Sequence, residues 1–404
     1  MLYSQRRHES LQSSPWKEAQ AHNVIQAIVT DTEQQWNPQK TYWPIHPLDR
    51  DFPPPVPTYT CLYLGAAGVL WALDYLHKAT AIDLSLNPAV LIGAVYATYH
   101  QAPDTGAVVP SLFMGEVGIA LVHWRLAPDD AIANRLYEQI EANIANPTNE
   151  AFWAAPGTML AALWMSEWTG ETKWIELYRR NVDYLWQQWQ YNSDFDCYLW
   201  IQDLYGRTRQ MTGPAHGYAG NLYALLRGVD HLATEKQQLL YKRTAQLLAK
   251  TAQVKDDAAN WLPNVTTRSW LPKQLLAQWC HGAPGMVTSL AQTYPLGIFE
   301  TLDRLLLQAG ELTWQAGPLK KGSNLCHGTA GNGYAFLKLF ARTQDEQWLE
   351  RARQFAMHAI GQYHRCKEQY GLGRYTLWTG DLGLAIYLWH CIQAEAAFPS
   401  LDVV

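Results

Sequence analysis

The strongest constraint on the fold is an internal repeat, a Gly-x-x-Gly motif followed by an apolar run. Seven copies occur between residues 61 and 389. Six of them keep the first motif glycine: Gly65, Gly115, Gly217, Gly282, Gly328 and Gly380. The third copy has Ala154 in that place and keeps the second glycine as Gly157. Repeated units of this kind share one core, so the repeat is a better guide to the number of domains than the length of the chain.

The run after each motif predicts a buried helix. In the fourth copy the residues from Gly220 onward are small or apolar on nearly all sides, and a helix that is apolar all round must be buried. The stretches between copies, such as 174–189 and 237–252, are more polar and have apolar residues at helical spacing, which predicts an outer layer. Glycines at the start of each inner helix let backbones approach closely.

Seven inner and outer helix pairs could stack as an open solenoid or close into a ring. Solenoid repeats have nearly constant length, whereas the spacing here runs from 39 residues (Gly115 to Ala154) to 65 (Gly217 to Gly282). We therefore predict an all-α fold, a double-layered α/α toroid (barrel) of seven inner and seven outer helices. It would form a single domain over residues 56–404, with residues 1–55 as an N-terminal extension packed on the barrel.

Composition excludes several classes of partner. Lys and Arg number 31 against 36 Asp and Glu, a net charge of −5, which provides no basic surface for nucleic acid. The first residues lack the apolar core of a secretory signal, and no run of 18 apolar residues occurs. We therefore expect no membrane insertion and a cytosolic location. Six cysteines in so long a chain indicate reduced thiols or metal ligands instead of disulfides.

Departures from the repeat consensus gather just before the first motif glycine. The residues immediately before it are Leu64, Met114, Trp153, His216, His281, His327 and Thr379. One position earlier stand Tyr63, Phe113, Phe152, Ala215, Cys280, Cys326 and Trp378. Equivalent positions of a closed ring converge at one end, so Cys280, Cys326 and His327 are expected to lie together. Two thiolates and one imidazole suit Zn²⁺ and leave a fourth position for water or substrate, as in catalytic zinc sites.

The alternative is that these three residues are two buried cysteines and a core histidine. Matching positions in two repeats argue against it.

Other residues around the expected site have two interpretations each. His216 reads as an acid/base group with a pKa near ~6.5 or as a core histidine, and His281 as a group that orients substrate or as a structural residue. Lys321 and Arg374 could clamp an anionic substrate or belong to the solvated surface.

At these residues the sequence resembles the LanC-like (lanthionine synthetase C-like) family. The match is most specific at residues 279–285, Trp-Cys-His-Gly-Ala-Pro-Gly, and 325–332, Leu-Cys-His-Gly-Thr-Ala-Gly-Asn. The resemblance implies a double layer of seven inner and seven outer helices and a catalytic zinc held by Cys280, Cys326 and His327. It also implies that His216, in a His-Gly-x-x-Gly element, is an active-site histidine, and that Glu150 is the acidic residue of the third repeat.

The reaction implied by the resemblance is the addition of a thiol to the β-carbon of dehydroalanine or dehydrobutyrine, which makes a thioether. Zinc would keep the incoming sulfur as a thiolate, and His216 would act as acid or base, oriented by Glu150. The stand-alone branch, which uses glutathione, carries His after the first zinc cysteine, as His281 here, whereas peptide cyclases often carry Tyr. Lys321, and more loosely Arg374, resemble glutathione contacts. The expected partner is glutathione or a peptide or protein that contains a dehydroamino acid.

Two other functions are compatible with these residues. A non-catalytic zinc- and glutathione- or peptide-binding protein would use the same side chains. A sugar-active α/α-toroid enzyme would need paired carboxylates and Trp platforms, although most of the 19 Trp fall at helical spacing, which indicates packing. Metal content and adduct formation separate the three possibilities.

Overall fold

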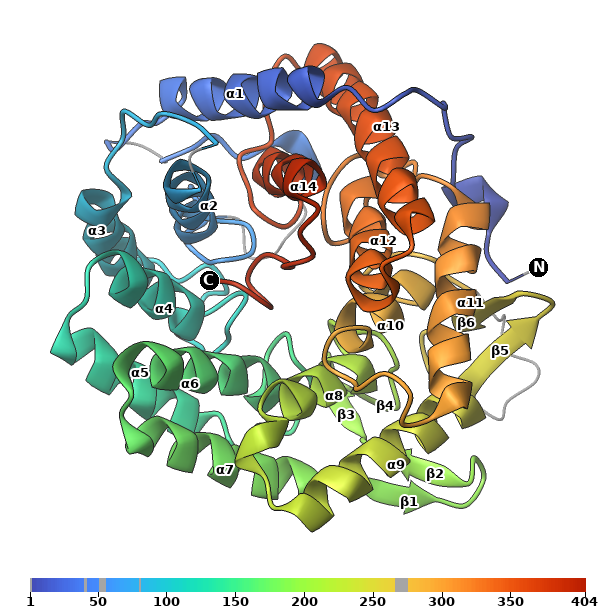
Figure 1. Ribbon diagram of the computed structural model, residues 1–404. Coiled ribbons are helices and arrows are strands. Elements are labelled where there is room, and N and C mark those ends of the chain that lie inside the picture. Colours follow the sequence, from blue (N-terminus) through green and yellow to red (C-terminus); the bar gives the residue numbers. More distant parts are fainter. Residues whose placement is uncertain (1, 40–41, 51–55, 80, 266–274) are drawn as a thin grey trace.

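The chain closes into a ring of two concentric layers of helices in the computed structural model (Figure 1). The structure describes residues 2–39, 42–50, 56–79, 81–265 and 275–404. Over these ranges the inner helices are α2 (Ala66–Lys78), α4 (Glu116–Leu126), α6 (Ala155–Thr169), α8 (Tyr218–Arg227), α10 (Ala283–Leu290), α12 (Thr329–Thr343) and α14 (Asp381–Gln393). Each inner helix contacts the next, and α14 contacts α2, so the ring is closed. The predicted toroid is confirmed.

The outer layer covers the inner ring. Its helices, among the described residues, are α3 (Pro88–Gln101), α5 (Asp130–Ala142), α7 (Thr172–Gln187), α9 (Thr234–Thr251), α11 (Glu300–Ala316), α13 (Glu346–Tyr370) and α1 (Glu18–Gln34). Helix α1 precedes the repeats in the chain, yet it packs against α14 and α13 (Figure 1). Its buried face includes Val24, Ile25, Ile28 and Val29. The segment expected to lie over the barrel as an extension therefore contains the outer helix of the last repeat.

The two motif positions have different structural roles. The first is the N-cap of each inner helix, and Ala154 has φ −114° and ψ −167°, close to the φ −118° and ψ −173° of Gly65. Alanine therefore keeps the turn in the third copy. At the second position a side chain has no room: an added Cβ would lie 2.1 Å from the carbonyl oxygen of Leu62 at Gly68 and 1.7 Å from that of Leu325 at Gly331. The first turn of each inner helix thus packs directly on the loop that leads into it.

A belt of backbone hydrogen bonds joins these loops at one end of the ring. Its members stand two positions before the first motif glycine. The direct bonds run from Tyr63 to Phe113 (3.0 Å), Phe152 to Ala215 (3.1 Å), Cys280 to Cys326 (3.1 Å), Cys326 to Trp378 (3.0 Å) and Trp378 to Tyr63 (3.2 Å), each N–H donating to a carbonyl oxygen. The Ser111 hydroxyl connects Phe113 with Phe152, because it accepts from the Phe113 N–H and donates to the Phe152 carbonyl. The belt fixes the main chain of the predicted ligands.

Aromatic side chains fill the part of the belt that carries no cysteine. Tyr63, Phe113, Phe152 and Trp378 are all buried. Their ring centroids lie 5.1 Å apart for Tyr63 and Phe152 and 5.3 Å apart for Phe113 and Trp378. Edge-to-face contacts of this kind add to the apolar area that the rings remove from water. The belt therefore has a packed aromatic arc beside its pair of thiols.

Residues 394–404 turn back into the centre of the ring (Figure 1). Asp402 accepts hydrogen bonds from the Tyr223 hydroxyl at 2.7 Å and from Lys338 Nζ at 2.6 Å. Ser400 Oγ accepts from Trp378 Nε1 at 2.9 Å, and Phe398 packs on the same indole. This tail segment ties α8 and α12 to the belt from inside the ring.

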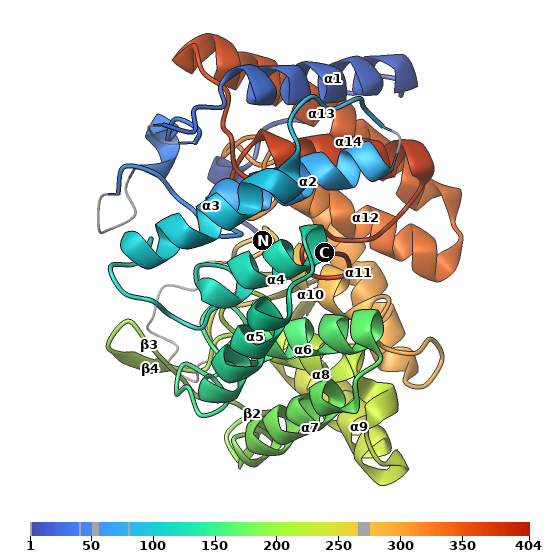
Figure 2. The same cartoon turned by 90° about the vertical axis from the view of Figure 1, so that its left-hand side faces the viewer.

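Three antiparallel hairpins and three short 3-10 helices, Gln5–Arg7, Pro47–Asp49 and Val229–His231, accompany the α-helices of the described structure. The hairpins are β1 (Gln190–Asn192) with β2 (Cys197–Leu199), β3 (Gln202–Leu204) with β4 (Arg207–Arg209), and β5 (Ala252–Lys255) with β6 (Ala258–Trp261). The β3–β4 hairpin projects at one end of the barrel (Figure 2). Its tip carries Tyr205 and Gly206 at positive φ, 53° and 70°. The Trp153 indole N–H donates to the Tyr205 hydroxyl at 3.0 Å, which places the tip at the belt end of the barrel.

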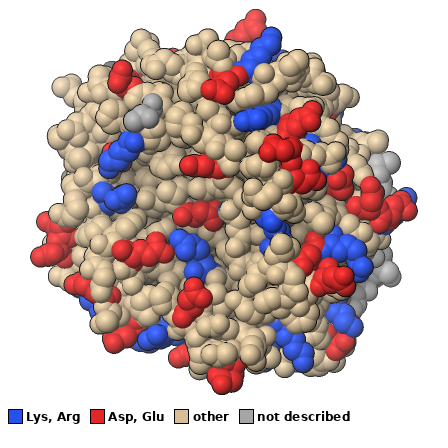
Figure 3. Space-filling model, in the orientation of Figure 1, with Lys and Arg blue, Asp and Glu red and all other residues tan. Residues whose placement is uncertain are grey.

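Charge is mixed on the surface. Lys and Arg are interspersed with Asp and Glu on the face shown in Figure 3. Among the described residues, no helix is long and apolar enough to cross a membrane.

Candidate metal and acid–base site

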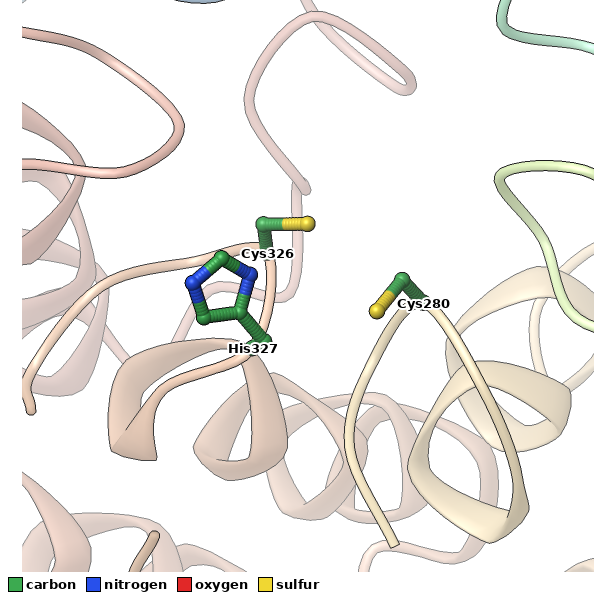
Figure 4. Close-up of side chains that lie close together, drawn as sticks. All are labelled: Cys280, Cys326 and His327. Atoms are coloured by element: carbon green, nitrogen blue, oxygen red, sulfur yellow. The ribbon is translucent and has the colours of Figure 1, made fainter. Parts of the chain in front are cut away.

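The three predicted metal ligands lie together where two inner helices begin. Cys280 precedes α10, and Cys326 and His327 precede α12 (Figure 4). Their potential ligand atoms all lie within 4.8 Å of one another. The backbone hydrogen bond from Cys280 N–H to the Cys326 carbonyl holds the two loops side by side. The proximity that the repeat alignment predicts therefore arises from main-chain contacts.

The donor set fits a zinc ion. Tetrahedral bonds of about 2.3 Å to sulfur and about 2.0 Å to nitrogen put ligand atoms roughly 3.5–3.8 Å apart, so small side-chain rotations would bring the three donors to these separations. Cys280 and Cys326 are 8 % and 7 % exposed. Burial, assisted by the charge of Lys321, lowers the pKa of His327 to about 3. Its imidazole is then neutral at pH 7, which is the form that coordinates a metal.

The two sulfurs have different surroundings. The Cys326 thiol donates to Cys280, which lowers the pKa of Cys280 even though burial opposes the shift. Gln278 Nε2 also donates to Cys280 Sγ at 2.9 Å. The neighbour of Cys326 on its other side is the Tyr63 hydroxyl. Sequence reasoning missed both Gln278 and Tyr63, because neither departs from the repeat pattern in a chemically distinctive way.

His216 and Glu150 form a hydrogen-bonded pair. His216 Nδ1 lies 2.9 Å from Glu150 Oε2, and the carboxylate is fully buried. Glu150 also accepts from the backbone N–H groups of Phe152 and Trp153, both at 2.8 Å. Burial acts to lower the pKa of His216, but the charge and hydrogen bond of Glu150 outweigh it, and the pKa is raised. With Nδ1 engaged, Nε2 is the nitrogen left for proton transfer.

Aromatic side chains surround this pair. The His216 ring lies 5.1 Å from Phe152 and 6.2 Å from Tyr205, centroid to centroid. Tyr205 comes from the hairpin tip and is 72 % exposed. Its ring is therefore open to solvent beside His216. The hairpin lies outside the repeats, so no alignment of copies could indicate its position.

His281 stands next to the first cysteine and is largely enclosed. Burial, together with the charge of His216, lowers its pKa to about 4, so the ring is neutral at pH 7. Its Nδ1 is buried and has no hydrogen-bond partner among the described residues. A free ring nitrogen at this place is compatible with the expected contact to substrate, which remains a prediction.

A cavity of about 430 Å³ opens beside His327. Its walls include Lys320, Lys321, Arg365, Arg374 and Glu9. Lys321 is exposed, as an anion-binding side chain should be.

Arg374 is only 7 % exposed, and its guanidinium is held by Asp49, with Nε 2.7 Å from Oδ2. The positive charge of Arg374 is thus already paired. Its expected role as a substrate contact, like that of Lys321, remains a prediction.

A family of known proteins resembles this chain in sequence over most of its length. Residues 56–403 match the model of the lanthionine synthetase C-like proteins. The chain belongs to the LanC-like family. Over 209 residues this LanC-like chain is 34 % identical to the glutathione S-transferase LANCL1 of Danio rerio, a match that spans 51 % of the chain and 48 % of that relative. Over 90 residues it is 41 % identical to the LanC-like protein GCL1 of Arabidopsis thaliana, covering 22 % of the chain and 20 % of that protein.

A solved structure shares the fold. Nisin cyclase aligns with a TM-score of 0.59 and 15 % sequence identity over 93 % of this LanC-like chain and 100 % of the cyclase. At this identity the likeness shows the toroid alone. The predicted family resemblance is confirmed by the match over residues 56–403.

Proposed function

We propose that this LanC-like protein is a zinc-dependent enzyme that adds a thiol, from glutathione or a peptide cysteine, to dehydroalanine or dehydrobutyrine. The observation that carries the proposal is the cluster of Cys280, Cys326 and His327 within 4.8 Å, at the same end of the ring as the His216–Glu150 pair. The relative named glutathione S-transferase supports glutathione as the donor. A cytosolic location, where glutathione keeps thiols reduced, is part of the proposal.

The residues present have complementary tasks in such an addition. Zinc, when bound, would supply a positive charge that favours release of the thiol proton to water and keeps the incoming sulfur as a thiolate. As the C–S bond forms at the β-carbon, the π electrons move to the α-carbon, which must then gain a proton. Protonated His216 would deliver that proton from Nε2, while Glu150 holds Nδ1 and stabilises the charged ring. Lys320 and Lys321 would attract the carboxylates of glutathione to the cavity beside His327.

Metal analysis and mass spectrometry of a dehydroalanine peptide test the proposal together. We expect one zinc per chain and a peptide–glutathione adduct that forms faster with enzyme than without it. Cys280→Ala should remove both. Cys197→Ala is the matched control, since Cys197 is fully buried in β2, outside the metal cluster. Full metal and full activity in Cys280→Ala would overturn the proposal, and glutathione binding without an adduct would show a binding protein instead.

A further inference from the structure

We propose that Gln278 is a positioning residue for the metal-binding sulfur of Cys280, and that Arg7, from outside the repeats, holds Gln278 in the orientation this requires. The inference rests on the proposed zinc function. It adds to that function a connection between the first residues of the chain and the metal loop.

The contacts form a chain of two hydrogen bonds. An Arg7 guanidinium nitrogen donates to Gln278 Oε1 at 3.0 Å, and Gln278 Nε2 lies 2.9 Å from Cys280 Sγ. Gln278 is 5 % exposed, so water does not compete freely for its amide. A guanidinium has donors and no acceptor. The amide oxygen must therefore face Arg7, which turns the NH₂ group toward the sulfur.

The backbone around Gln278 also limits its movement. Its N–H donates to the His281 carbonyl at 3.1 Å, and the His281 N–H donates back to the Gln278 carbonyl at 3.0 Å. This closed turn contains Cys280. The backbone of Gln278 and the sulfur that its amide contacts are thus held on one small loop, and the bond from Arg7 orients the amide on that loop.

An N–H donor that faces sulfur favours the thiolate over the thiol. It also withdraws electron density from that sulfur, and hydrogen bonds to ligand atoms tune both metal affinity and electronic properties. Cys326 has the Tyr63 hydroxyl as its neighbour instead. Each sulfur thus accepts from its own donor, an amide N–H at Cys280 and a hydroxyl at Cys326, so loss of the Gln278 amide would change the sulfur of Cys280 alone.

Arg7 is held in place on both sides. Its carbonyl accepts from Lys320 N–H at 3.0 Å, and Glu9 N–H donates to the Pro318 carbonyl at 3.0 Å. His8 Nδ1 contacts the Gly317 carbonyl at 2.9 Å. The segment around Arg7 is thus paired with the chain that leads into the sixth repeat. Any loosening of this segment would release the Gln278 amide.

Zinc affinity and the spectrum of the cobalt-substituted protein test the inference. Gln278→Leu keeps the approximate size of the side chain and removes the donor. We expect zinc, measured by competition with a chelator, to bind about 10- to 100-fold more weakly. The thiolate-to-cobalt charge-transfer band should also move, which a purely structural role for Gln278 would not cause.

Arg7→Ala should weaken zinc binding and move the cobalt band, each to a smaller extent than Gln278→Leu. Arg7→Lys, which keeps a donor, should recover part of the wild-type zinc affinity and band position. Arg6→Ala is the matched control, because Arg6 is exposed and adjacent. The double variant Arg7→Ala/Gln278→Leu should be no worse than Gln278→Leu, since both changes remove one contact chain. Arg7 lies outside the barrel repeats, so its variants remain informative even where Gln278→Leu does not fold.

The outcomes separate this inference from the proposed function. A wild-type protein that binds no zinc overturns both. A wild-type protein that binds zinc, with the Arg7→Ala variant unchanged in affinity and in cobalt spectrum, overturns the role of Gln278 and Arg7 alone.

Discussion

The backbone N–H of Cys280 donates to the carbonyl oxygen of Cys326 over 3.1 Å. The two cysteines are thus held together by main chain, whether or not an ion is bound between them. Proteins whose metal site forms only on binding unfold when the metal is removed. Here we expect the opposite: chelation should leave the far-UV circular dichroism unchanged and lower the melting temperature only by the loss of ligand binding to the folded state. Loss of helical signal in the metal-free protein would contradict this expectation.

Substitution of His216 should separate chemistry from metal binding. In His216→Gln we expect zinc content to stay at the wild-type level while the rate of thiol addition falls by roughly 10²- to 10⁴-fold, because a positioned acid is lost. Metal analysis and single-turnover kinetics on one preparation check both halves. An unchanged rate would rule out proton transfer by His216.

The charge of Glu150 should be visible in the pH profile. Glu150 raises the pKa of His216, against the effect of burial. In Glu150→Gln the pKa of His216 should therefore fall. If protonated His216 is the acid, activity is lost as pH rises through this pKa, so the loss should begin at lower pH in the variant.

Glu116→Gln is the control for the Glu150 experiment. Glu116 is also a fully buried carboxylate, at the first residue of inner helix α4, and its partners include Arg135, 2.8 Å away. We expect this variant to lose stability and to keep the wild-type pH profile of kcat/KM. A profile that moves equally in both variants would mean that general destabilisation, and not the His216 contact, causes the shift.

The second motif glycine should be intolerant of any side chain. A Cβ at Gly331 would meet the Leu325 carbonyl oxygen at 1.7 Å, and Leu325 directly precedes Cys326. We expect Gly331→Ala to cost at least about 3 kcal/mol of unfolding free energy and to weaken zinc binding. In Gly361→Ala, within outer helix α13, the nearest atom is 3.4 Å away on the flexible Arg365 side chain. That variant should be more stable by about 0.5–1 kcal/mol, as urea unfolding can show.

The buried ion pair of Lys338 and Asp402 should contribute to the free energy of unfolding, because neither charge can be left alone in the interior. Lys338 is fully buried, and its Nζ lies 2.6 Å from Asp402 Oδ2. Removing one partner leaves a charge without compensation, so Asp402→Ala should cost about 3–5 kcal/mol. Lys338→Met/Asp402→Ala should recover part of this loss. As a control, Lys236→Met breaks a 2.7 Å pair with the exposed Asp183 and should cost less than about 1 kcal/mol.

Asp381 should make stability fall as pH rises. Burial raises its pKa to about 7, although the Arg374 N–H donates to Oδ2 at 2.8 Å. Between pH 4 and 7 the folded protein therefore keeps a proton that the unfolded chain releases. In this window the group lowers the unfolding free energy by up to about 1.4 kcal/mol per pH unit, and its contribution is constant above pH 7.

Asp381→Asn should remove that slope, because the amide stays neutral at every pH. The difference between wild type and variant, measured by urea unfolding from pH 4.5 to 7.5, isolates this one group. Asp194→Asn, at an exposed position, should leave the slope in place. Parallel curves for wild type and Asp381→Asn would show that the carboxyl of Asp381 is ionised throughout.

The repeat pattern was enough to predict the layers and the proximity of two cysteines and a histidine. Cys280, Cys326 and His327 occupy matching positions of two copies, and a closed ring must bring such positions to one end. The same logic places His216 near them. The alignment succeeds because the second glycine forces each loop onto its own helix in the same way.

Contacts made from outside the repeats could not be predicted. Arg7 donates to Gln278, which lies 271 positions away in the sequence. Asp49 accepts from Arg374, which lies 325 positions away. No local pattern encodes such contacts, because the N-terminal segment has no second copy against which a departure would be noticed. For the same reason α1 was not recognised as the outer helix of the last repeat.

The belt makes neighbouring repeats interchangeable as a scaffold. Where a direct bond of the belt joins two adjacent copies, their loop residues lie side by side, and the side chains decide whether an aromatic arc or a pair of thiols results. What distinguishes the fifth and sixth copies is the set of parts that reach them from elsewhere: Arg7 on the sulfur side and the two lysines beside His327. A cysteine pair transplanted to another directly bonded pair of copies would thus acquire similar main-chain spacing but would lack the Arg7–Gln278 contact and the neighbouring lysines.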